Sequence, residues 1–245
     1  MLRSMMFPAA ILAAAACSDL SGPNPGPGQG RVVVTAAGTG QGTANGPAMA
    51  AGEPMTMGGT VLVVQEAQVV LREIELWRAG GSTRCDSSGT GGGDCEKLRS
   101  GPMLVSLALD GSARQVISVP ADTGSYRRLE FEIHKPDDDT QADASFIARH
   151  PGFRRISIRV TGTWNGTPFV FTSDLNAEQR IELFPPIEVR AGQTTEVTMY
   201  LDVRKWFLNA TGTAFVNPTT ANDGGENENL VKGNIRLSIE AGVRL

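Results

Sequence analysis

Four aspartates crowd into one short stretch, residues 134–155, which reads HKPDDDTQADASFIARHPGFRR. They are Asp137, Asp138, Asp139 and Asp143. Calcium binds about six to eight oxygen ligands, many of them carboxylates, so this stretch predicts a Ca²⁺ site. It is not an EF-hand, because Ala142 stands where that loop needs glycine. The alternative is a solvated acidic loop that Arg149, Arg154 and Arg155 neutralise.

Glu130 and Glu132 offer a second kind of chemistry. Two residues apart on one strand, they would lie on the same face about 7 Å apart, which suits the carboxylate pair of glycosidic hydrolysis. The alternative, which we prefer, is alternating charge on a solvated face. A zinc site would need the two histidines, His134 and His150, to converge with a carboxylate; we interpret both as surface residues.

Motifs of other enzyme classes are missing from the sequence. It contains no G-x-S-x-G, no P-loop and no H-E-x-x-H, and its net charge of −4 argues against nucleic acid as a partner. Trp164 sits at a predicted hairpin tip, where it could stack on a sugar ring. We therefore expect a binding or structural module of unknown ligand rather than an enzyme. The alternatives are an envelope hydrolase whose site is assembled only in three dimensions and a glycan-binding module.

The amino terminus predicts export. Residues 1–17, MLRSMMFPAAILAAAAC, place one positive charge before an apolar run that is too short to span a membrane. The small residues before Cys17 resemble the lipobox of bacterial lipoproteins, in which that cysteine is acylated. This implies a lipid anchor at Cys17 and a place in the bacterial cell envelope, facing the periplasm or the surface; an ordinary signal peptide is the alternative. Envelope proteins or glycans are the expected partners.

Cys85 and Cys95 are the remaining cysteines. They flank the glycine-rich segment CDSSGTGGGDC, and an oxidising envelope would let them form a disulfide. A redox pair is the alternative, but it normally has a C-x-x-C spacing.

Composition divides the chain after residue 59. Residues 18–59 are rich in glycine and proline and predict a flexible tether, although RVVVT at 31–35 could add a strand to the folded body. Residues 60–245 carry the period-two alternation of strands and predict one β-sandwich domain. The fold class is mainly β: a two-sheet antiparallel sandwich with a short C-terminal helix.

Alternating apolar residues and turn signals place the strands. The firmest element is a hairpin around Asn165-Gly166, because both residues tolerate positive φ. Pro185-Pro186 should separate two strands, since proline cannot donate to a ladder. The predicted strands are 62–77, 103–109, 115–119, 129–134, 155–163, 169–173, 180–184, 187–190 and 195–203.

Two segments carry mixed signals. Residues 66–77 contain helix formers but alternate at Val70, Ile74 and Leu76, which favours a strand. Residues 227–241 fit both periods, and we predict a helix there.

Four of these segments resemble a family of bacterial envelope lipoprotein domains. They are VLREIELW (70–77), PMLVSLAL (102–109), VPADTGSYRRLEFEI (119–133) and IEVRAGQTTEVTMYLDV (187–203). The resemblance implies a transthyretin-like or immunoglobulin-like sandwich in the envelope. Here Asp122 and Thr123 intrude before Gly124, where the family pattern has a tighter turn. The resemblance brings no activity with it.

Overall fold

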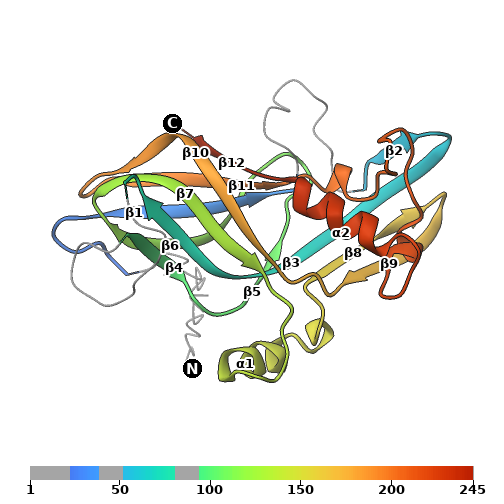
Figure 1. Ribbon diagram of the computed structural model, residues 1–245, viewed down its shortest axis with the longest axis horizontal. Helices are drawn as coiled ribbons and strands as arrows, with labels where there is room; N and C mark the ends of the chain where they lie inside the picture. The colour runs from blue at the N-terminus through green and yellow to red at the C-terminus, as the bar shows by residue number, and fades with distance from the viewer. Residues whose placement is uncertain (1–22, 39–51, 81–93, 245) are drawn as a thin grey trace, which may run out of the picture.

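The computed structural model describes residues 23–38, 52–80 and 94–244 (Figure 1). The described chain is mainly β, as predicted, and has two short α-helices, of which only the C-terminal one was predicted. The strands are β1 (Gln29–Ala37), β2 (Pro54–Met57), β3 (Thr60–Arg78), β4 (Cys95–Arg99), β5 (Met103–Ser106), β6 (Arg114–Asp122), β7 (Gly124–Ile133), β8 (Ile158–Trp164), β9 (Thr167–Ser173), β10 (Ala177–Val189), β11 (Thr194–Leu201) and β12 (Ile239–Arg244).

The strands form two sheets. The smaller has the order β12-β11-β1-β6, and the larger has the order β10-β7-β3-β8-β9, with β2, β4 and β5 also pairing with β3. The expectation of purely antiparallel sheets was wrong at one pair, since β1 runs parallel to β11. The strand predicted at 31–35 is thus part of β1, in the interior of the smaller sheet.

Strand β3 is the spine of the larger sheet. The ambiguous segment 66–77 is a strand, as predicted, and belongs to one 19-residue element. The pleat of this strand is interrupted at Glu73, which has a φ of 52°. From Ala67 to Leu71 the side chains in the main core are odd-numbered, as at Val69 and Leu71, and after Glu73 they are even-numbered, as at Ile74 and Leu76. This β-bulge reverses which residues point outward.

The hairpin predicted around Asn165-Gly166 is confirmed. It joins β8 to β9, and Asn165 and Gly166 have φ values of 49° and 82°. Positive φ at both central residues is the geometry of the turn whose twist matches paired strands. By contrast, Pro185 and Pro186 do not separate two strands: β10 is continuous, and only its pairing with β7 skips, between Glu182 and Ile187.

One apolar core lies between the sheets. It includes the fully buried Trp206, Phe207 and Phe171, and the last two rings meet edge to face with centroids 5.1 Å apart. Helix α2 (Glu228–Leu237) covers this end of the core with Val231 and Ile235. The helix predicted within 227–241 is confirmed, and the chain then continues as β12.

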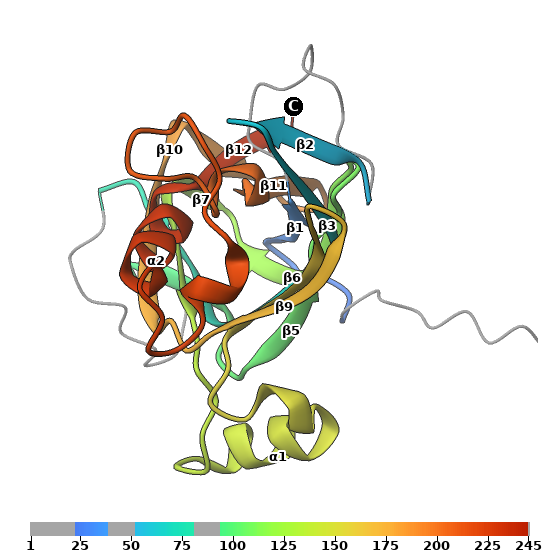
Figure 2. The same cartoon turned by 90° about the vertical axis from the view of Figure 1, so that its right-hand side faces the viewer.

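Residues 134–155, predicted as a loop, hold helix α1 (Gln141–Arg149) and a short 3₁₀ helix, Pro151–Phe153. The side chain of Thr140 caps α1 by accepting a hydrogen bond from the Asp143 amide at 3.0 Å. Phe146, Ile147 and Phe153 pack with Val70 of β3 in a small second core. Figures 1 and 2 show α1 standing off the body of strands. We call residues 135–157 the α1 insertion.

Several predictions concern segments outside the described residues. These are the signal sequence and Cys17, the segment around Cys85, and part of the tether, whose described portion contributes β1 and β2. Within the described ranges, no helix is long and apolar enough to cross a membrane.

Candidate functional site: an acidic pocket on the larger sheet

A pocket of about 440 Å³ opens where β3, β7 and the start of β10 lie side by side. Five of the residues that line the pocket are glutamates, and none is basic. The remaining lining residues are Phe131, Asn176 and Ala177. The glutamates, which we call the pocket carboxylates, are Glu73, Glu75, Glu130, Glu132 and Glu178. Every charged side chain of the lining is therefore acidic.

The strand register explains why these carboxylates share a face. Leu129, Phe131 and Ile133 of β7 belong to the core, so the alternate residues of β7 point away from it. Pairing with the neighbouring strands then aligns side chains, all but one of them charged, in rungs across the sheet. The rungs are Lys97-Glu75-Glu130-Arg180, Trp77-Arg128-Glu182 and Arg72-Glu132-Glu178.

Glu75 and Glu130 are adjacent on the first rung and are both buried. Lys97 Nζ lies 3.6 Å from Glu75 Oε1, and Arg180 Nε lies 3.2 Å from Glu130 Oε1. Arg128 Nε lies 2.8 Å from the same Glu130 oxygen. The cations thus flank the pair from outside the pocket lining.

Burial raises the pKa of Glu75, although Lys97 opposes the shift. Burial likewise raises the pKa of Glu130 against the opposing charges of Arg128 and Arg180. Burial therefore disfavours the ionised form of both carboxylates. A cation that entered the pocket would offset that effect.

The bulge in β3 supplies a further carboxylate. Glu73 adopts a positive φ, and the pairing of β3 with β7 skips from Arg72 to Glu75. A non-glycine residue with such a φ is uncommon and costs about 1 kcal/mol or more. The bulge lets the pocket be lined by Glu73 as well as by Glu75.

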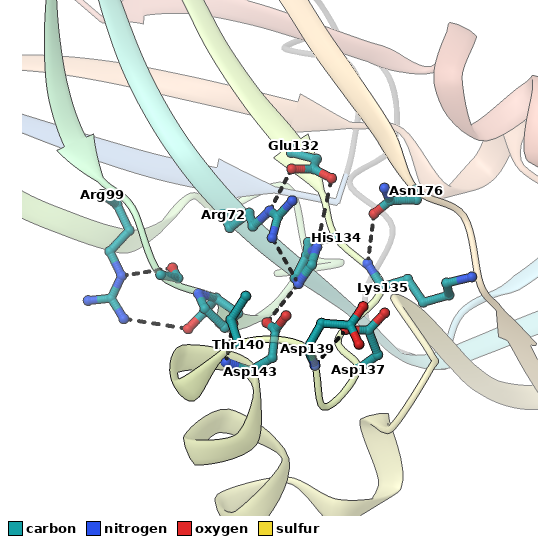
Figure 3. A network of polar contacts seen from close by, with 12 residues as sticks. Arg72, Arg99, Glu132, His134, Lys135, Asp137, Asp139, Thr140, Asp143 and Asn176 are labelled. Atoms are coloured by element: carbon teal, nitrogen blue, oxygen red, sulfur yellow. Dashed lines mark hydrogen bonds and ion pairs between the residues drawn. The ribbon is translucent and has the colours of Figure 1, made fainter. Parts of the chain in front are cut away.

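Glu132 joins the pocket to a buried ionic network, which Figure 3 shows. Arg72 Nε donates to Glu132 Oε2 at 2.6 Å, and His134 Nδ1 lies 3.7 Å from Glu132 Oε1. His134 Nε2 bonds to Oδ1 of Asp143 at 2.8 Å. Arg72 also approaches His134 Nε2, at 3.5 Å. The network thus spans β3, β7 and α1.

This network corrects two of our interpretations. His134 is only 4% exposed, so it is not a surface histidine. Glu130 is 6% exposed, and Glu132 is half-buried among ion pairs, so neither lies on a freely solvated face. Burial would raise the pKa of Glu132, but its contacts with His134 and Arg72 lower it to about 2. His150 lies elsewhere, with its ring 4.8 Å from that of Phe146.

The four aspartates of the predicted calcium site have different environments. Asp143 is buried against His134, whereas Asp138 is exposed and ion-paired with Arg154. Asp137 accepts a hydrogen bond from the backbone amide of Asp139 at 3.2 Å. In the described part of the chain they do not form a group of three ligand atoms within 4.8 Å of one another.

Another acidic group does meet that spacing. Carboxylate oxygens of Asp174, Asp223 and Glu228 lie within 4.8 Å of one another, as the ligands of a metal ion would. Lys232 already bonds to two of them: its Nζ lies 2.6 Å from Asp174 Oδ1 and also contacts Glu228. The hydrogen bond from Lys232 lowers the pKa of Asp174. The ammonium group of Lys232 thus already offsets part of the negative charge of this cluster.

The other predicted site residues are placed as follows. Trp164 ends β8 beside the hairpin turn, where it is half-buried and packs against the main core. Cys95 begins β4 and is buried. Its predicted partner Cys85 and the predicted anchor Cys17 lie outside the described residues, so the disulfide and the lipid anchor stay predictions.

Sequence reasoning missed Glu73, Glu75 and Glu178 as site residues. The segment REIEL contained the signal, because two glutamates follow Arg72, one at the bulge and one just after it. It also missed α1, although Thr140 and Asp143 have the T-x-x-D spacing of a helix amino terminus.

Comparisons with known proteins give a distant likeness. No family model and no curated protein matches the sequence. A solved structure, MbnP from Methylosinus trichosporium, is similar over 73% of this chain and 77% of that one, with 13% sequence identity and a TM-score of 0.38. At this TM-score the similarity assigns no role to any residue of this chain.

Proposed function

We propose that this protein is a lipid-anchored binding module of the bacterial cell envelope whose acidic pocket takes ligands with ammonium or guanidinium groups. The observation that carries the proposal is the pocket itself: five glutamates and no basic side chain line about 440 Å³. Two of these glutamates are buried with a raised pKa, so a bound cation would stabilise their ionised form.

The spacing of the pocket carboxylates favours an organic cation over a metal ion. A metal draws its ligand atoms close together, and the pocket carboxylates do not include three oxygens within 4.8 Å of one another. Separated carboxylates instead suit a ligand that carries several spaced positive charges. Polyamines and the lysine or arginine side chains of peptides share that chemistry.

The sequence of the amino terminus supports the envelope location. An apolar run that ends in AAAAC, followed by a glycine- and proline-rich segment, would anchor and space the folded body from a membrane. The ligand would then be one that the envelope offers.

Titration calorimetry at low ionic strength tests the ligand class. We expect tetralysine and spermidine to bind the protein, and an uncharged tetrapeptide of similar size not to bind. Binding should weaken with added salt, because these charges are partly exposed. Equal affinity for the charged and uncharged peptides would contradict the proposal. A preference for tetralysine over spermidine would identify a peptide rather than a polyamine.

Glu75 and Glu130 also support a second candidate function, hydrolysis. Neighbouring carboxyl groups, one protonated and one ionised, form the acid and base or nucleophile of glycosidases. These two residues face each other across β3 and β7, and both have a raised pKa. Hydrolysis of aryl glycosides by the parent protein but not by Glu130→Gln would favour this candidate.

A further inference from the structure

Glu132 belongs to two features at once. Its side chain lines the acidic pocket, and it also pairs with Arg72 and faces His134 in the buried network. His134 in turn bonds to Asp143, the third residue of α1. The imidazole therefore stands between a carboxylate of the pocket and a carboxylate of the α1 insertion (Figure 3).

The charges that face His134 come from three elements. Arg72 lies on β3, Glu132 on β7 and Asp143 on α1. Nearby, Arg99 is occupied with the backbone carbonyls of Gly101 and Pro102. The ammonium group of Lys135 is directed to Asp174, 3.6 Å away. With the imidazole protonated, two cations balance two carboxylates; with it neutral, one negative charge is left over.

We propose that His134 couples the α1 insertion to the acidic pocket, so that protonation of the imidazole tightens the insertion on the sheet and weakens cation binding in the pocket. This inference rests on the proposed function, because it assumes that the pocket binds cations. The imidazolium and Arg72 both offset the charge of Glu132. When the imidazole loses its proton, the pocket gains net negative charge and attracts a cation more strongly.

The pKa of His134 determines how docking of α1 should change with pH. Burial would lower the pKa of His134, but Glu132 and Asp143 raise it above its ordinary value of 6.5. A group whose folded-state pKa is raised contributes stability fully below about pH 6.5, and that contribution is lost as the pH rises through the folded-state pKa. Docking of α1 should therefore weaken in mildly alkaline solution. By reciprocity, a bound cation should release the proton from His134.

Hydrogen exchange tests the docking without any ligand. The intrinsic exchange rate is corrected for pH, and protection of the α1 amides is compared between pH 6.0 and pH 8.5. We expect protection to fall several-fold at the higher pH in the parent and in His150→Gln, which changes the other histidine. It should be low and independent of pH in His134→Gln. Equal protection at both values in the parent protein would overturn the docking half of the proposal.

Binding of tetralysine tests the coupling. From pH 6.5 to pH 8.5 we expect affinity to rise roughly fivefold in the parent and in His150→Gln, and less than about twofold in His134→Gln. Asp143→Asn removes one of the carboxylates that raise the pKa of His134, so it should move the rise to lower pH. Binding that does not vary with pH in the parent would overturn the coupling and leave the proposed function intact. Absence of binding at every pH would overturn both.

Discussion

Glu75 on β3 and Glu130 on β7 are directly opposed in the sheet, and both line the same pocket. Like charges that face each other across two strands are destabilising unless something compensates them. Lys97 and Arg180 compensate this pair from the two outer strands of the rung. A surface selected for stability alone would alternate the charges, so we interpret the adjacent carboxylates as a binding feature.

Ser238 should contribute to stability through two buried hydrogen bonds, one of which its hydroxyl donates to the carbonyl oxygen of Ile235 at 2.7 Å. The same hydroxyl accepts from the indole Nε1 of Trp206 at 2.8 Å, and Ser238 and Trp206 are fully buried. Ser238→Ala leaves that N–H without its partner, which costs about 1–3 kcal/mol. Urea denaturation measures the change. The exposed Ser100→Ala should change stability by less than about 0.5 kcal/mol; equal effects of the two substitutions would contradict the assignment.

Lys232 should prevent calcium from stabilising the protein at the cluster of Asp174, Asp223 and Glu228. Because its ammonium already pairs with two of the carboxylates, millimolar Ca²⁺ should not change the melting temperature of the parent protein. Lys232→Met should lower stability by about 1 kcal/mol, and calcium should restore it. Thermal unfolding with calcium, magnesium or chelator measures this.

The same measurement tests the predicted calcium site at 134–155. Stabilisation of the parent protein by calcium, abolished in Asp223→Asn, would show that the cluster beside Lys232 is a metal site. If the double variant Asp137→Asn, Asp139→Asn abolished it instead, the site would be the one predicted from the sequence.

Cys17 should carry the membrane attachment. The predicted lipidation requires its thiol, so Cys17→Ser should abolish labelling by radioactive palmitate and change the fractionation of the protein with membranes. Labelling that persists in Cys17→Ser would refute the anchor.

Cys85 and Cys95 should form a disulfide in the oxidised protein. Mass mapping without reduction should recover their two peptides joined. A ring this small stabilises by at most about 3 kcal/mol, so the double serine variant should still fold. Alkylation of both thiols in unreduced envelope protein would exclude the bond.

Local chemistry made much of the fold predictable. Asn165-Gly166 fixes its hairpin because few other residues accept positive φ twice in succession. The period-two pattern located β7 and β11, where alternate apolar residues enter a single core. The helix within 227–241 was predictable because Val231 and Ile235 are four residues apart on one face.

The site could not be predicted in the same way, because it depends on register. Val70, Ile74 and Leu76 look like one face of a strand, but the bulge at Glu73 places Val70 against α1 and the other two in the main core. That shift decides which charged residues of β3 meet β7. Similarly, His134 looks exposed until the α1 insertion, whose helix lies further along the chain, places Asp143 over it.

The most direct test of the account compares two pairs of substitutions that remove equal charge. Glu75→Gln, Glu130→Gln changes the pocket, whereas Glu66→Gln, Glu188→Gln changes exposed glutamates outside it. Burial disfavours the ionised form of Glu75 and Glu130, so the pocket variant should fold. The control variant changes exposed side chains and should fold as well. Circular dichroism checks both. The measurement is the dissociation constant for tetralysine at pH 7.5 and low ionic strength. We predict a loss of about tenfold or more in the pocket variant and less than about twofold in the control; equal losses in the two would show that net charge, and not the pocket, binds the peptide.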